Sequence, residues 1–93
     1  MGAEQTIRRH VWVDGRVQGV WFRETCRRLA AEVGVAGWVR NRADGRVEAV
    51  FEGTTAAVSE MVAWCRSGPP RAMVVDVQVL DEAPVGESGF SVG

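Results

Sequence analysis

Hydrophobic residues recur along this chain with one of two periods, the two-residue period of a strand or the longer period of a helix. Glycines mark several of the places where one pattern gives way to the other. Residues 6–13 alternate with a period of two, which is typical of a strand. From about residue 22 to 33 the period becomes that of an amphipathic helix with one apolar stripe, formed by Phe22, Cys26, Leu29, Ala30 and Val33. Gly34 is the expected C-terminal stop of this helix. The first third of the chain is therefore predicted as a strand, a loop over residues 14–20, and a helix.

The rest of the chain shows the same two kinds of pattern, one typical of strands and one typical of a helix. Further alternating segments predict strands at about 36–41, 46–52, 73–79 and 89–92. The Asp44-Gly45 step is typical of a hairpin turn between the first two of these strands. A second helix is predicted to begin after Thr54 or Thr55, either of which can cap its N-terminus, and to end near Arg66.

The predicted order of elements is β-α-β-β-α-β, which is the split βαβ arrangement of ferredoxin-like α+β folds. In such a fold the two amphipathic helices cover one face of an antiparallel sheet and leave the other face partly open. A chain of 93 residues is the size of a single domain, so residues 1–93 are expected to form one unit. This superfold hosts many unrelated functions, so the function depends on the site.

The basic residues narrow the possible chemistry. The 11 cations and 12 anions nearly cancel, which argues against nucleic-acid binding through bulk charge. Every basic residue is an arginine, so Schiff-base nucleophiles, pyridoxal-phosphate attachment and a Walker A lysine are excluded. A site for an oxyanion must therefore use guanidinium groups and backbone amides.

No metal or cofactor site is predicted. Cys26, Cys65 and the single histidine, His10, are scattered along the chain and do not make a zinc quartet. The cysteines fall at the same end of the two predicted helices, so a disulfide is conceivable, but small buried side chains are favoured. The sequence shows neither a signal-peptide pattern nor an apolar run of about 20 residues, so we expect a cytoplasmic protein with no membrane partner. Nothing in the sequence demands an oligomer, so a monomer is expected.

The loop between the first strand and the first helix is the most informative segment. Gly15 and Gly19 allow the backbone to turn tightly and to approach a ligand closely. The loop leads into a helix N-terminus, whose free N–H groups favour an anion, and Arg23 adds a charge that can bind two phosphate oxygens. These features describe a phosphate cradle, although spacing alone also allows an ordinary turn with a solvated arginine.

Asn41 is the second candidate, at the end of the predicted strand 36–41. In a split βαβ unit the first two strands run parallel, which would place Asn41 at the same end of the sheet as the glycine-containing loop. Its side-chain amide can accept a hydrogen bond from water and donate one to a phosphoryl oxygen. The alternative is an asparagine that stabilises the turn.

Two motifs are similar to those of a known family. The run Val13–Arg23, VDGRVQGVWFR, resembles the first signature of the acylphosphatase family. The segment 37–41, GWVRN, with Gly45, Val47 and Gly53 after it, resembles the second. The resemblance covers nearly the whole chain, and it implies a ferredoxin-like enzyme that hydrolyses small acyl phosphates to a carboxylate and inorganic phosphate.

The resemblance also implies roles for individual residues. Arg23 would bind the phosphoryl group and Asn41 would orient the attacking water, without a metal or cofactor. The phosphoryl group would be wrapped by the backbone amides of Gly15, Arg16, Val17, Gln18, Gly19, Val20, Trp21 and Phe22. The Trp21 side chain is expected to pack, the alternative being that it stacks on an aromatic acyl group.

The remaining charged residues are predicted to be ordinary surface groups. His10 is taken as a surface strand residue, and solvated charges are expected at Arg8, Arg9, Arg40, Arg42 and Arg46. The other function classes considered are an RNA-binding or regulatory module and a phosphate sensor with a silent site. Residues 46–52 lack the aromatic and basic pattern of an RNA-binding strand, so no nucleic-acid partner is expected.

Overall fold

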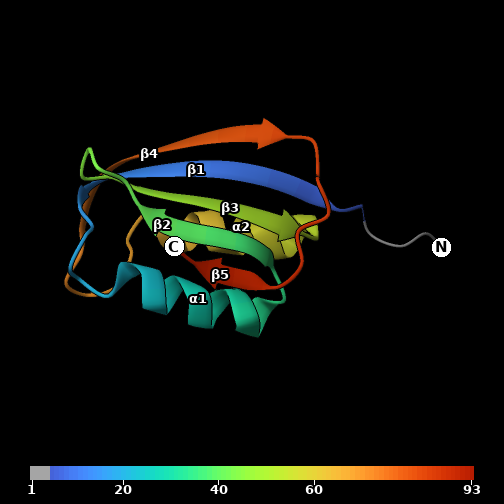
Figure 1. Cartoon of the computed structure of the whole chain (residues 1–93), viewed down its shortest axis with the longest axis horizontal. Coiled ribbons are helices and arrows are strands. Elements are labelled where there is room, and N and C mark those ends of the chain that lie inside the picture. Colours follow the sequence, from blue (N-terminus) through green and yellow to red (C-terminus); the bar gives the residue numbers. More distant parts are fainter. Residues whose placement is uncertain (1–4) are drawn as a thin grey trace.

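The computed structural model describes residues 5–93, which form one five-stranded sheet and two helices (Figure 1). The elements are β1 (Ile7–Arg16), α1 (Phe22–Val33), β2 (Ala36–Asn41), β3 (Val47–Gly53), α2 (Thr55–Cys65), β4 (Met73–Glu82) and β5 (Phe90–Val92). Both helices and the hairpin therefore lie where the sequence patterns predict them. None of these helices is long and apolar enough to cross a membrane.

The sheet has the strand order β4-β1-β3-β2-β5. Strands β1 and β2 are both antiparallel to β3 and so run parallel to each other, which is the predicted split βαβ arrangement. One detail differs from the antiparallel sheet that the sequence predicts. Strand β5 pairs with β2 in parallel, with Gly37 opposite Phe90 and Val39 opposite Val92, so the sheet is mixed.

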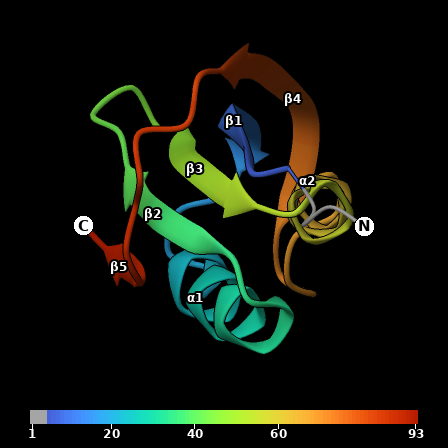
Figure 2. The same ribbon diagram turned by 90° about the vertical axis from the view of Figure 1, so that its right-hand side faces the viewer.

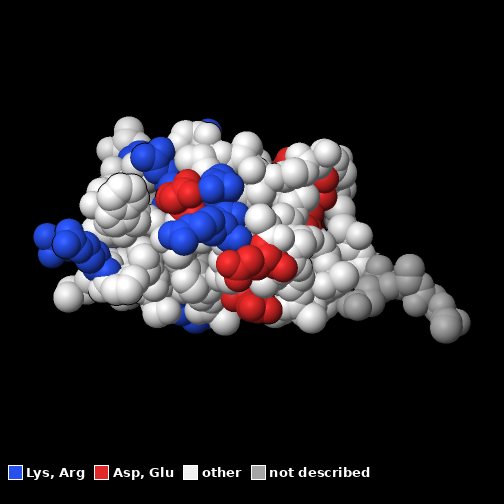
Figure 3. Space-filling view, turned by 90° about the horizontal axis from the view of Figure 1, so that it is seen from below, with Lys and Arg blue, Asp and Glu red and all other residues white. Residues whose placement is uncertain are grey.

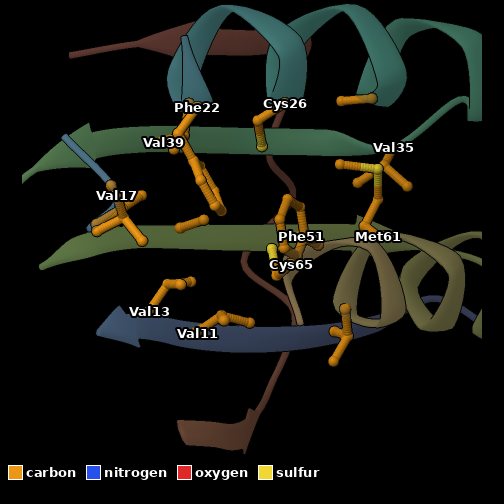
Figure 4. Close-up of a cluster of buried hydrophobic side chains, with 14 of the residues drawn as sticks. Val11, Val13, Val17, Phe22, Cys26, Val35, Val39, Phe51, Met61 and Cys65 are labelled. Carbon is orange, nitrogen blue, oxygen red and sulfur yellow. The ribbon is translucent and has the colours of Figure 1, made fainter. Parts of the chain in front are cut away.

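Both helices lie on one face of the sheet, and the core lies between them and the sheet (Figure 2). Helix α1 buries Phe22, Cys26 and Ala30 from its predicted apolar stripe. Figure 4 shows side chains of α1 and α2 directed toward the strands, among them Cys26 and Cys65. Both cysteines are buried free thiols, as favoured by the sequence, and burial raises the pKa of Cys65 to about 12.

Strand β1 continues three residues beyond the predicted 6–13, which shortens the loop that follows. Its pairing with β4 shifts register between Asp14 and Gly15, and it then continues to Arg16, opposite Met73. Gly15 at this bulge has φ 125°, and a Cβ there would meet the main-chain oxygen of Met73 at 2.2 Å. Only glycine fits this position, because both the backbone conformation and the space exclude a side chain.

The sheet face away from the helices, here called the open face, carries a network of ion pairs. Arg8 Nη1 lies 2.8 Å from Glu52 Oε2 and its Nε lies 2.8 Å from Glu82 Oε1. The ring nitrogens of His10 contact Glu48 and Glu82, and the His10 ring stacks on Trp12 at 4.0 Å. The prediction that His10 and Arg8 are surface residues is therefore wrong, because carboxylates from distant strands cover them.

The other arginines predicted as solvated are also paired with carboxylates. Arg40 and Arg42 both contact Glu48, whose side chain is only 5% exposed. Arg9 contacts Asp81, and Arg46 contacts Asp44. Burial alone would raise the pKa of Glu48, but hydrogen bonds from His10 and the arginines lower it below its ordinary value, so the carboxylate stays charged.

Candidate active site

A cavity of about 490 Å³ lies at the end of the sheet where β1 leads into α1. It is called the main cavity below, and its lining includes Gly19, Trp21, Arg23, Arg27, Asn41 and Val92. These residues come from the β1–α1 loop, the first turns of α1, the end of β2 and β5. In the space-filling view most of the arginine surface lies toward this end of the molecule (Figure 3).

The segment of residues 15–21, called the glycine loop below, begins with the last two residues of β1 and presents free backbone donors beside the main cavity from residue 18 onward. The Gly15 amide, which the sequence placed among the ligand donors, donates instead to Asp14 Oδ1 at 2.9 Å. Within residues 5–93, the amides of residues 18–22 donate no hydrogen bond to another group. Gly19 and Trp21 have φ angles of 73° and 68°, in the left-handed region. Successive free N–H groups at a helix N-terminus form a site for an anion.

The glycine loop is fixed to the β2–β3 hairpin by a side chain. Gln18 Nε2 donates to the main-chain oxygen of Arg42 at 2.8 Å and to that of Arg46 at 3.0 Å. The side-chain amide of Gln18 is thus used for positioning, and its backbone N–H remains free. The side chains of Val17, Val20 and Phe22 are buried in the core, so these residues can serve a ligand only through their amides.

Arg23 lies in the first turn of α1 and contacts no Asp or Glu side chain in the described part of the chain. Its Nη1 donates to the main-chain oxygen of Gly93 at 2.6 Å, beside β5. The neighbouring Glu24 does not neutralise it, because Glu24 is bound to Arg27 at 2.6 Å. The hydrogen bond from Arg27 lowers the pKa of Glu24, so this pair is charged at neutral pH.

Asn41 ends β2 and lines the same cavity as Arg23. Its Oδ1 is buried and accepts no hydrogen bond; among the described residues no other buried side-chain nitrogen or oxygen lacks a partner. An unpaired buried acceptor is costly unless a ligand or water supplies a donor. Arg23, Asn41 and the glycine loop thus border the same cavity, at the end of the sheet where the sequence analysis placed them together.

Other candidate residues lie differently from the sequence prediction. Trp21 is 70% exposed and borders the main cavity, so the expectation that its side chain packs is wrong. Arg16 lines a neighbouring cavity, which it shares with Gly19, Val20 and Arg71.

Three residues of the main-cavity lining were missed from the sequence: Glu24, Arg27 and Val92. Arg27 follows Arg23 by one helical turn, and this spacing is a signal that was available. Val92 reaches the cavity only through the pairing of β5 with β2, which no local pattern indicates. Within residues 5–93, no group of three or more His, Cys, Asp or Glu side chains is arranged so that it could hold a metal ion.

The fold and the cavity define a small α+β protein with a loop of free backbone amides at a helix N-terminus, and comparisons with known proteins identify the family. The family model described as Acylphosphatase matches residues 9–92. An acylphosphatase of Gloeobacter violaceus is 57% identical over 86 residues, which are 92% of each chain. One from Roseiflexus sp. strain RS-1 is 60% identical, covering 91% of this chain and 92% of the relative.

A solved structure agrees with these matches. The structure of an acylphosphatase from Coxiella burnetii superposes with a TM-score of 0.91 at 38% identity, covering 95% of this chain and 93% of that one. The chain belongs to the acylphosphatase family, and it is an enzyme of that family, an acyl-phosphate phosphohydrolase.

Proposed function

We propose that the main cavity is the active site, in which the glycine loop and Arg23 hold the phosphoryl group and Asn41 orients the attacking water. The observation that carries this proposal is that Arg23, Asn41 and the glycine loop all border one cavity. Free amides and a guanidinium that contacts no Asp or Glu side chain within residues 5–93 suit a group with negative charge spread over several oxygens.

The reaction then needs positioning more than proton transfer. The water oxygen forms a bond to phosphorus while the bond from phosphorus to the acyl oxygen breaks, and the carboxylate leaves with that electron pair. A carboxylic acid has a pKa of about 4, so no general acid has to protonate the leaving group. The loose transition state of phosphoryl transfer is stabilised by charge and alignment, which Arg23 and the loop amides supply without a metal.

Asn41 suits the second role because its Oδ1 is the unpaired acceptor described above. A water that donates to this oxygen has one lone pair directed away from Asn41 and available to attack phosphorus. Asn41 accepts a hydrogen bond but takes no proton, and both protons of the water stay on the phosphate product, since the loose transition state develops little bond order to the nucleophile. The exposed Trp21 ring at the cavity edge provides a surface on which an aromatic acyl group can lie.

Benzoyl phosphate hydrolysis tests the proposal. The wild type should turn over benzoyl phosphate equally well with and without EDTA, and Arg23→Gln should abolish measurable turnover. Arg28→Gln is the matched control, because Arg28 is an exposed α1 residue outside the cavity, and this variant should keep wild-type activity. Loss of wild-type activity on chelation, or normal activity of Arg23→Gln, would overturn the assignment.

A further inference from the structure

A second cavity borders the glycine loop, and its charged residues have no ion-pair or side-chain hydrogen-bond partner among residues 5–93. This cavity, called the arginine cavity below, has a volume of about 390 Å³ and is lined by Arg16, Gly19, Val20 and Arg71. Within the described residues neither Arg16 nor Arg71 forms an ion pair or a side-chain hydrogen bond. By contrast, Arg8, Arg9, Arg27, Arg40, Arg42 and Arg46 all contact carboxylates.

The strand pairing explains why these two arginines meet. Arg16 is the last residue of β1 and pairs with Met73, the first residue of β4. Arg71 lies two residues before Met73, in the segment that joins α2 to β4. Figure 1 shows this segment and the β1–α1 loop at the same end of the molecule. The bulge at Gly15 extends β1 far enough to bring Arg16 there.

The position of the arginine cavity suggests what it binds. The two cavities share Gly19, which has no side chain to separate them. Guanidinium groups that gather in a hollow without a carboxylate repel each other, and an anion relieves that repulsion. Arg28 and Arg66 also lack an ion-pair partner in the described part of the chain, but they line neither cavity.

We propose that Arg16 and Arg71 form a second anion subsite, which selects acyl phosphates whose acyl group carries a further negative charge, a carboxylate or a second phosphate. This inference rests on the proposed function, because the first phosphoryl group must occupy the main cavity. The subsite acts on substrate affinity and leaves the attack of water on phosphorus unchanged. Its contribution should fall as ionic strength rises, because both arginines are exposed.

Hexanoyl phosphate and adipoyl monophosphate test the subsite, because they differ only in a terminal methyl or carboxylate. At low ionic strength the wild type should have the higher kcat/KM for adipoyl monophosphate, through a lower KM. Arg71→Gln should reduce the ratio of the two kcat/KM values by about fivefold, as expected for one exposed ion pair. Arg16→Gln should reduce the same ratio, whatever it does to the loop, and the double variant should bring it close to one.

Arg28→Gln removes the same charge away from both cavities and should keep the wild-type ratio. If the ratio of the two kcat/KM values is the same in the wild type, Arg71→Gln and Arg28→Gln, the subsite does not exist. If Arg28→Gln lowers the ratio as much as Arg71→Gln, the preference reflects overall charge and the subsite is again refuted. If the wild type hydrolyses neither compound, the proposed function itself fails, and this outcome is distinct from the other two.

Discussion

The side-chain amide of Gln18 donates a hydrogen bond of 2.8 Å to the main-chain oxygen of Arg42. This bond connects the glycine loop to the residue that directly follows Asn41, so it fixes the proposed phosphate donors relative to the proposed water-orienting residue. Gln18 makes a second bond of this kind, at 3.0 Å, to Arg46 across the hairpin. A single side chain thus holds both parts of the site in place.

Replacing Gln18 should therefore loosen the site while leaving the fold intact. Gln18→Ala should raise the KM for benzoyl phosphate several-fold, because the free loop amides are less well aligned. It should lower the free energy of unfolding by only about 1 kcal/mol, since both carbonyl oxygens keep backbone donors. Steady-state kinetics and urea denaturation measure the two effects. The control is Gln78→Ala, at an exposed position of β4, which should change neither the KM nor the free energy of unfolding. An unchanged KM in Gln18→Ala would contradict the anchoring role of Gln18.

Gly15 should tolerate no side chain. In Gly15→Ala the new Cβ would lie 2.2 Å from the Met73 oxygen and 2.9 Å from the Val75 nitrogen, and both are backbone atoms that cannot rotate away. We expect a loss of more than about 2 kcal/mol in the free energy of unfolding. Gly34→Ala is the matched control, because Gly34 has φ 81° but no atom within 4 Å of its Cβ position. It should cost only about 1 kcal/mol, and equal losses in the two variants would refute the steric argument.

Trp21 should affect which acyl group is preferred. Trp21→Ala should lower kcat/KM for benzoyl phosphate by about fivefold and leave that for acetyl phosphate nearly unchanged, because only the aromatic acyl group can stack on the ring. Parallel kinetics with both substrates measure the ratio. Trp38→Ala provides a control on the open face, away from the cavity. An equal loss on both substrates would show that Trp21 shapes the glycine loop instead.

The open-face network should make stability depend on pH. Burial alone would raise the pKa of Glu52, but backbone amides of Val85, Gly86 and Glu87, together with Arg8, lower it below its ordinary value of 4.5. A carboxylate whose pKa is lowered by folding stabilises the protein above its unfolded pKa. That contribution is lost as the pH falls through the lower folded value. Urea denaturation should therefore show the free energy of unfolding decreasing below pH 4.5.

The matched variants of this experiment are Glu52→Gln and Glu60→Gln. Glu52→Gln should have a lower free energy of unfolding at neutral pH than the wild type. Its free energy of unfolding should also decrease less steeply in acid, because the carboxylate whose pKa folding lowers has been removed. Glu60 lies on an exposed part of α2 and forms no ion pair within residues 5–93, so Glu60→Gln should retain the wild-type slope. If the free energy of unfolding decreased equally steeply with falling pH in the wild type and both variants, the network would not couple folding to protonation.

The sequence was informative where a feature is determined locally. The apolar stripe of α1 and the glycine that follows it specify the helix, and the structure places its ends at Phe22 and Val33. The Thr54 side chain accepts a hydrogen bond from the Ala57 amide at 3.2 Å, so α2 also begins where a capping residue predicts. The parallel direction of β1 and β2 followed from the order of elements, because it is a property of the split βαβ unit.

Features that depend on distant partners were not predictable. Arg8 looks like a surface charge until β3 and β4 bring Glu52 and Glu82 beside it, 44 and 74 residues away along the chain. The extension of β1 depends on a bulge against β4, so the local pattern ended the strand too early. Trp21 was expected to pack, which is the more frequent role of a tryptophan, but its left-handed backbone at φ 68° begins α1 and its ring is exposed.

The central claim, that Arg23 binds phosphate while Asn41 acts on water, is tested most directly by measuring kcat and the affinity for inorganic phosphate in the same two variants. Asn41→Ala should reduce kcat for benzoyl phosphate on the order of 100-fold and change the phosphate Ki by less than about threefold. Arg23→Gln should abolish phosphate inhibition together with turnover. The account would be contradicted if Asn41→Ala weakened phosphate binding as much as Arg23→Gln, or if it kept the wild-type kcat.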